Sequence, residues 1–158
     1  MSQQTSEAVI IQRTIAAPPE KVFAAWTDPG LLAQWWGPPG THVTSVEIDL
    51  QINGRYRIGL QQPNQDIYFV NGTYQLIQPP EKLIFTWHWE QPSMDIGQSL
   101  VTIEIRRHGP HSNLTLTHAQ LPQPARASHR QGWQGILHNL ATFLNQPPLT
   151  EQLPISNE

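Results

Sequence analysis

The 158-residue sequence contains no cysteine, which excludes a disulfide framework, a cysteine-ligated zinc site and a thiol nucleophile. Its stability therefore has to come from an ordinary packed core. A domain of this length buries roughly 70% of the surface that its unfolded chain exposes, which is enough for such a core. Nothing in the composition requires a metal ion or an oxidising compartment.

Charged residues and long apolar runs are also scarce. Asp, Glu, Lys and Arg make up 13% of the chain, the net charge is −3, and the basic residues are scattered. A nucleic-acid-binding surface needs clustered basic residues to neutralise phosphates, so that class is excluded. No stretch approaches the roughly 20 apolar residues of a membrane span, and the first residues lack the basic and apolar regions of a signal peptide. We therefore expect a cytoplasmic protein without a membrane span.

Motifs for catalysis and metal binding are missing as well. There is no Gly-x-Ser-x-Gly elbow, no His-Glu-x-x-His pair and no glycine-rich phosphate loop. His108 and His111 flank a turn without a third ligand, so no metal site and no cofactor are expected. Acidic residues of the predicted strands fall on the polar faces, which disfavours a buried carboxylate pair and makes an enzyme the less favoured reading. These residues are Glu47, Asp49, Glu90 and Glu104.

What the sequence does contain is a regular alternation of apolar and polar residues. Six segments between Val46 and His118 alternate in this way, which is typical of antiparallel strands with one face in water. One of them runs from Tyr68 to Leu76 with both of these residues on the apolar face. The apolar, β-branched segment 8–15 predicts a further strand at the start of the chain.

Three helices are predicted around these strands. Pro18-Pro19 and Asp28-Pro29 each open a short helix, the second extending to Trp36, because proline suits the first helical turn. A long helix from about Pro124 to Leu144 has one apolar stripe. The sequence therefore predicts an α+β fold, in the order β-α-α-β6-α, with a curved antiparallel sheet gripping the C-terminal helix. One domain covers residues 8–145, and residues 1–7 and 146–158 are expected to be flexible tails.

Several motifs resemble a known family. They are Pro-x-x-x-Val-Phe-x-Ala-Trp-Thr-Asp-Pro (18–29), Trp-Trp-Gly-Pro (35–38), Asn-Gly-Arg-Tyr (53–56), Pro-Pro-Glu-Lys-Leu-Ile-Phe-Thr-Trp (79–87), Leu-Thr-Leu-Thr-His (114–118) and Gly-Trp (132–133). In these the chain resembles the START-like (SRPBCC, helix-grip, birch-pollen-allergen-like) superfamily and, within it, the family of the activator of heat shock protein 90 ATPase. The resemblance implies a C-terminal helix that closes over an internal cavity. Asn53 departs from the pattern, in which a second glycine is frequent, so its turn is expected to differ slightly.

Aromatic residues provide the strongest indication of a site. The chain has six tryptophans, and buried Trp and Tyr side chains need partners for their N–H and O–H groups. Trp26, Tyr74 and Phe85 are expected to fill the core. An apolar pocket with a few polar groups is the default ligand site. The candidate pocket residues are Trp35, Tyr56, Tyr68, Trp87, His118 and Trp133.

His118 is the ionisable residue that the strand alternation turns inward. An inward histidine is more often a hydrogen-bonded core residue than a catalyst. An imidazole with an ordinary pKa near ~6.5 could nevertheless orient a ligand or move a proton, so every catalytic hypothesis for this chain depends on His118.

Three functions remain open. The first is binding of a small hydrophobic or aromatic ligand without chemistry. The second is a co-chaperone-like module that activates the chaperone ATPase. It is disfavoured because the full co-chaperone resembles this chain only in its second domain, and 158 residues leave no room for the additional domain. The third is a cyclase- or dehydratase-like enzyme that acts on a polyketide-type substrate through His118. A homodimer is compatible with the sequence.

Overall fold

The computed structural model describes residues 8–94 and 96–145, so both predicted tails lie outside the described residues. The predicted order of strands and helices is confirmed. The elements are β1 (Val9–Ile15), α1 (Pro19–Thr27), α2 (Pro29–Leu32), β2 (His42–Ile48), β3 (Arg55–Gln61), β4 (Ile67–Gln78), β5 (Lys82–Trp89), a 3₁₀ turn (Pro92–Met94), β6 (Ser99–His108), β7 (His111–Ala119) and α3 (Gln123–Leu144).

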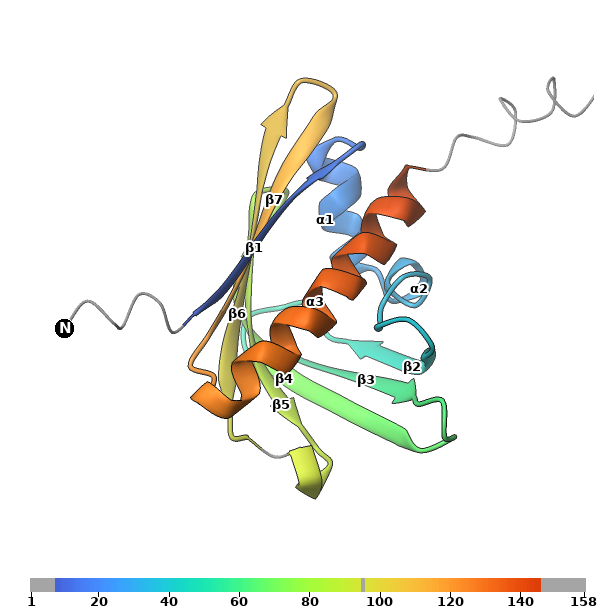
Figure 1. Cartoon of the computed structure of the whole chain (residues 1–158). Coiled ribbons are helices and arrows are strands. Elements are labelled where there is room, and N and C mark those ends of the chain that lie inside the picture. The colour runs from blue at the N-terminus through green and yellow to red at the C-terminus, as the bar shows by residue number, and fades with distance from the viewer. Residues whose placement is uncertain (1–7, 95, 146–158) are drawn as a thin grey trace, which may run out of the picture.

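The strands form one antiparallel, seven-stranded sheet in the order β1-β7-β6-β5-β4-β3-β2. Strands β2 to β7 follow one another along the chain, and β1 pairs with β7 at the far edge. Helices α1 and α2 carry the chain from one edge strand to the other. The sheet curves, and α3 lies across its concave side (Figure 1). This is the α+β, helix-grip arrangement that the sequence predicts.

The short helix α2 begins as predicted but ends early. The carboxylate of Asp28 accepts hydrogen bonds from the backbone N–H groups of Gly30 (2.8 Å) and Leu31 (3.1 Å), which makes it the N-terminal cap. The helix ends at Leu32, however, and Trp35 and Trp36 lie in the turns that follow. The prediction that they belong to the helix was wrong, because the chain leaves the helical path after Leu32, ahead of Gly37 and the two prolines that follow it.

A bulge changes the face of one strand residue. Between β4 and β5 the register shifts, so that Tyr74 pairs with Phe85 but Leu76 pairs with Ile84. Ile84 alternates with the buried Leu83 and Phe85, which places Leu76 on the outer face. The predicted inward position of Leu76 was therefore wrong. The alternation itself carries no information about this extra residue.

The turn between β2 and β3 explains why asparagine can stand at position 53, where the family pattern frequently has glycine. Its φ of 67° is in the left-handed region, which asparagine tolerates better than most residues. At Gly54, a Cβ would lie 2.0 Å from the carbonyl oxygen of Asp49, so glycine is required there. The Asn-Gly pair thus supplies both conformations that this turn needs.

The main core lies between the concave face of the sheet and the three helices. The stripe of α3 contributes Trp133, Ile136, Leu137 and Leu140, all of them buried. Strands β6 and β7 supply Val101, Ile103, Leu114 and Leu116 from below. None of the helices in the described part of the chain is long and apolar enough to cross a membrane.

Candidate functional site

His118, near the end of β7, is fully buried and is hydrogen-bonded to a residue of α3. The indole Nε1–H of Trp133 donates a 2.9 Å hydrogen bond to its Nδ1, and its Nε2 lies 2.7 Å from the hydroxyl of Ser99. Because an indole nitrogen can only donate, Nδ1 must be the unprotonated ring nitrogen. Nε2 then carries the proton and donates it to Ser99 Oγ. His118 is therefore neutral, with both of its nitrogens occupied.

A second histidine packs against the first. The ring centroids of His118 and His129 are 5.4 Å apart. His129 lies on α3, where Nδ1 is 2.9 Å from the carbonyl oxygen of Ala125 and Nε2 accepts a 3.1 Å hydrogen bond from Trp89 Nε1. This pattern requires the proton on Nδ1, the opposite tautomer to that of His118. Both imidazoles are thus neutral acceptors for a tryptophan of a neighbouring element.

Burial keeps these two histidines uncharged. Burial, together with a smaller contribution from the nearby His129, lowers the pKa of His118 to about 3. Burial also lowers the pKa of His129, although the carbonyl of Ala125 partly opposes this. Protonation of His118 would place an N–H on Nδ1, facing the indole N–H of Trp133, and the hydrogen bond between them would be lost. The geometry supports a structural role for His118 over a proton shuttle, because neither nitrogen is available to a substrate.

Tryptophan rings surround this histidine pair. Trp87 on β5 packs against Trp133 (centroids 4.9 Å apart) and His118 (5.4 Å), and Trp36 packs against both tryptophans at 5.9 and 5.5 Å. A cavity of about 60 Å³ lies beside these rings. Its wall consists of Trp36, Pro38, Leu60, Trp87, Trp89, His129, Gly132, Trp133 and Ile136.

One polar atom in this wall has no partner. The indole Nε1–H of Trp87 is buried, and no residue of 8–94 or 96–145 accepts a hydrogen bond from it. Leaving a buried donor unpaired costs about 1–3 kcal/mol, so such groups are uncommon. A residue of the apolar, aromatic wall of the cavity thus carries one unused hydrogen-bond donor.

The other end of the interior is more tightly filled. Tyr56 packs edge-on against Phe85 (centroids 5.3 Å apart), and its hydroxyl donates a 2.6 Å hydrogen bond to the carbonyl oxygen of Thr86. Burial raises the pKa of Tyr56 far above its ordinary value. The cavity here measures about 10 Å³ and is lined by Trp26, whose Nε1–H also lacks a partner among the described residues.

The structure thus divides the six predicted pocket residues. Trp87, His118 and Trp133 contact one another, and the two tryptophans line the larger cavity. Trp35 is buried one ring away, and its Nε1–H donates to the carbonyl of Ala25 at 3.2 Å. Tyr56 lies at the tightly packed end. Tyr68 is half-buried opposite Leu60 on β3 and lines neither interior cavity.

The predicted pocket residues did not include seven wall residues of the larger cavity, namely Trp36, Pro38, Leu60, Trp89, His129, Gly132 and Ile136. The spacing along α3 could have identified one of them. His129 precedes Trp133 by four residues, which places both on the same helix face.

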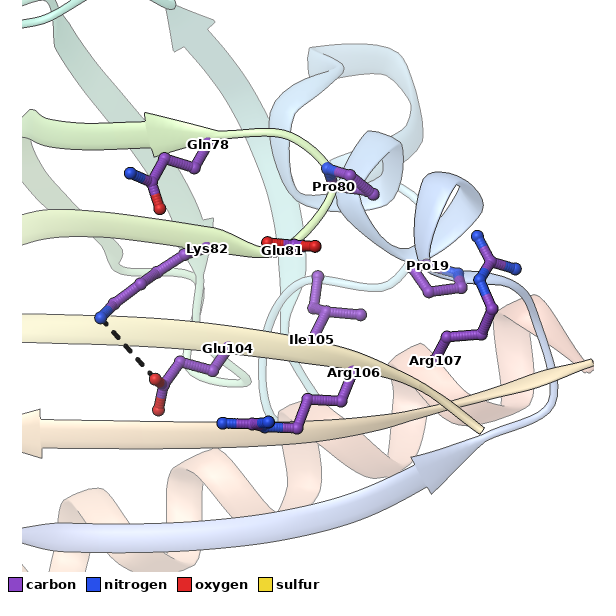
Figure 2. Close-up of a pocket in the computed structure, with 9 residues that line it drawn as sticks. All are labelled: Pro19, Gln78, Pro80, Glu81, Lys82, Glu104, Ile105, Arg106 and Arg107. Carbon is purple, nitrogen blue, oxygen red and sulfur yellow. Dashed lines mark ion pairs between the residues drawn. The ribbon is translucent and has the colours of Figure 1, made fainter. Parts of the chain in front are cut away.

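A wider hollow of about 510 Å³ lies at the surface, where the start of α1 approaches the β4–β5 turn and β6 (Figure 2). Its charges are largely paired. Lys82 Nζ lies 3.7 Å from Glu104 Oε2, and Arg107 Nη2 lies 2.6 Å from Glu20 Oε2. It contains none of the predicted pocket residues and no concentration of one charge. Across residues 8–94 and 96–145, no three acidic or histidine side chains are grouped so that they could hold a metal ion.

The fold is shared with several solved structures. Protein CV1439 from Chromobacterium violaceum is 24% identical with a TM-score of 0.82, over 90% of this chain and 99% of that chain. The AHSA1 protein SPO3351 from Silicibacter pomeroyi is 29% identical with a TM-score of 0.75, over 85% and 95%. DynU16, a protein in the dynemicin biosynthetic locus, is 22% identical with a TM-score of 0.71, over 89% and 48%. No curated protein matches the sequence.

A family model gives the more specific result. The model described as activator of Hsp90 ATPase homolog 1-like protein matches residues 16–145. That range contains α1, the strands from β2 to β7 and all of α3, including each candidate pocket residue. The predicted resemblance is confirmed: the chain belongs to the activator of Hsp90 ATPase homolog 1-like family.

Proposed function

We propose that this protein binds a small, largely apolar molecule with an aromatic ring and one hydrogen-bond acceptor, between β5 and α3. The observation that carries the proposal is the unpartnered, buried Nε1–H of Trp87 beside the 60 Å³ cavity. An acceptor oxygen on the ligand would satisfy this donor. The neighbouring rings of Trp36 and Trp133 would contact the apolar part.

The cavity has to widen to admit a ring. A cavity of about 150 Å³ can hold benzene, whereas this one measures about 60 Å³. Trp89 is the wall residue suited to move, because it is half-buried at the end of β5 and its indole nitrogen donates one hydrogen bond, to His129, among the described residues. Breaking that hydrogen bond would cost about 1 kcal/mol. The space of the displaced indole would then join the cavity, and His129 Nε2 could accept a hydrogen bond from the ligand.

Catalysis receives less support than binding. His118 is the residue on which a cyclase- or dehydratase-like activity would depend, and Trp133 and Ser99 occupy both of its nitrogens. Its pKa of about 3 also leaves it without a transferable proton near neutral pH. Family membership and the shared fold of DynU16 are compatible with ligand binding and add no catalytic residue to this site.

Acetophenone and ethylbenzene test the proposal directly, because the two molecules have similar shapes and differ in the carbonyl oxygen. We expect acetophenone to change tryptophan emission and to bind several-fold to about tenfold more tightly, the value of one neutral hydrogen bond. Saturation at about 100 times the dissociation constant would add roughly 2.7 kcal/mol of stability, which a thermal melt detects.

Two matched variants locate the binding position. Trp87→Phe removes the unpartnered N–H and should make the two affinities equal. Trp26→Phe removes the corresponding N–H at the other cavity and should leave the preference for acetophenone unchanged. The proposal fails if acetophenone, flavonoids and fatty acids all leave emission and melting temperature unchanged.

A further inference from the structure

Two glycines interrupt the middle of α3, and only one of them has a packing reason. Glycine is an unfavourable residue in a helix interior, so each position needs an explanation. At Gly135, a Cβ would lie 2.9 Å from Cδ of Pro39, in the loop that packs on the helix. A Cβ at Gly132 would meet no atom within 4 Å. The packing of the protein therefore accounts for Gly135 and leaves Gly132 unexplained.

The open space at Gly132 belongs to the cavity side of the helix. Gly132 is a wall residue of the 60 Å³ cavity and is itself half-buried. Trp89 and His129, which are also half-buried, belong to the same wall. The deeper wall residues Trp87 and Trp133 are almost completely covered, with 2% and 1% of their surfaces exposed. The cavity thus reaches toward solvent where the helix lacks a side chain.

We propose that the gap at Gly132 is the portal of the ligand site, through which a flat aromatic ring enters and then lies against the backbone of α3. This inference rests on the proposed function and adds the route by which the ligand enters and one contact that the bound ring makes. A Cβ-free helix position lets a planar group approach the backbone more closely than any other residue would allow. The hydrogen bond between Trp89 and His129, 3.1 Å long, closes the other side of the portal.

The test places a side chain in the gap. Gly132→Leu should slow the association of acetophenone by about tenfold or more in stopped-flow tryptophan fluorescence. Gly132→Ala should slow it less and raise the melting temperature by about 2 °C, because alanine is the better helix residue and its methyl group has room. Gln131→Leu places the same side chain at an exposed neighbouring position and should leave the association rate of acetophenone unchanged.

A second measurement needs no ligand. Acrylamide should quench the buried tryptophans of Gly132→Leu less than those of the wild type, and Gln131→Leu should behave as the wild type. The portal is refuted if wild type and Gly132→Leu bind acetophenone at the same rate and are quenched equally, and the proposed function would survive that result. If the wild type binds neither acetophenone nor any of the flavonoids and fatty acids, the proposed function is removed, and the portal with it.

Discussion

The two ends of the interior use the same kinds of residue but differ in how completely they are filled. At the end with Trp26 and Tyr56 the remaining space is about 10 Å³, and at the end with Trp87 it is about 60 Å³. Each end contains a buried indole N–H without a partner among the described residues. A high aromatic content therefore does not by itself predict a pocket. The two ends differ in how much space the backbone leaves around the rings.

Glycines at the two ends show this difference most clearly. Gly72 on β4 lies at the packed end, where a Cβ would be 1.9 Å from the carbonyl oxygen of Thr86 and 2.7 Å from the ring of Tyr56. Gly132 on α3 lies at the other end, where a Cβ would contact nothing within 4 Å. The same substitution, glycine to alanine, should therefore have opposite effects on stability at the two positions.

Among the single substitutions, the largest effect on stability is expected for Gly72→Ala. The new methyl group would push β4 away from β5 or Tyr56 out of its place, since the atoms that it meets include backbone. We expect the free energy of unfolding to fall by about 3 kcal/mol or more, measured by urea denaturation. A loss of less than about 1 kcal/mol would show that the packed end yields easily, and the comparison of the two ends would collapse.

A somewhat smaller effect distinguishes paired from unpaired indoles. Trp133→Phe removes both ring volume and the hydrogen bond to His118 Nδ1, so we expect it to cost about 3 kcal/mol. Trp26→Phe removes similar volume but no hydrogen bond, and should cost about 1–2 kcal/mol less. Urea denaturation of both variants gives this difference. Equal losses would mean that the bond to His118 adds nothing to the packing of the ring.

Acidification should weaken the end that contains the histidines. The folded-state pKa of His118 is lowered to about 3 from an ordinary value of 6.5, so the unfolded chain binds the proton more readily. The stability that depends on neutral His118 is complete above pH 6.5 and is lost as pH falls toward 3. Between these values the free energy of unfolding should decrease by about 1.4 kcal/mol per pH unit for this residue, and His129 should add to the slope.

His118→Asn is the control for that slope. Its amide oxygen can still accept from Trp133, but the side chain does not titrate, so the pH dependence of stability should become shallower. The Glu90 carboxylate, whose pKa is lowered by its hydrogen bond to Arg57, contributes its own loss at lower pH in both proteins. If His118→Asn and the wild type lose stability in parallel between pH 6.5 and 5, the buried histidine is not the cause.

The fold was predictable because each strand has one face in water, which makes the alternation visible in the sequence. The positions that were predicted wrongly are those whose conformation depends on contacts with another segment of the chain. Leu76 changes face at a bulge that is defined only by the partner strand, and α2 ends where the chain meets its neighbours. Alternation also predicted that Trp87 and His118 point inward.

The composition of the site was harder to predict. Which inward residues meet depends on where α3 crosses the sheet, and no local pattern encodes that crossing. Tyr56 and Tyr68 have inward positions on their strands but do not line the cavity beside Trp87. Gly132 was not predicted as a pocket residue for a different reason. It contributes the absence of a side chain, and the effect of that absence depends on the space around the residue in the folded protein.

The smallest expected effect is also the one with the opposite sign. Gly132→Ala should raise the free energy of unfolding by about 0.5–1 kcal/mol, because the methyl group improves helix propensity and meets no atom within 4 Å. Urea denaturation of the ligand-free protein measures this gain. Gly135→Ala is the matched control in the same helix, and it should be destabilising because its Cβ would press on Pro39. A loss of stability in Gly132→Ala would mean that the helix is already close-packed there, and the difference between the two ends would then reside in the tryptophan and histidine rings alone.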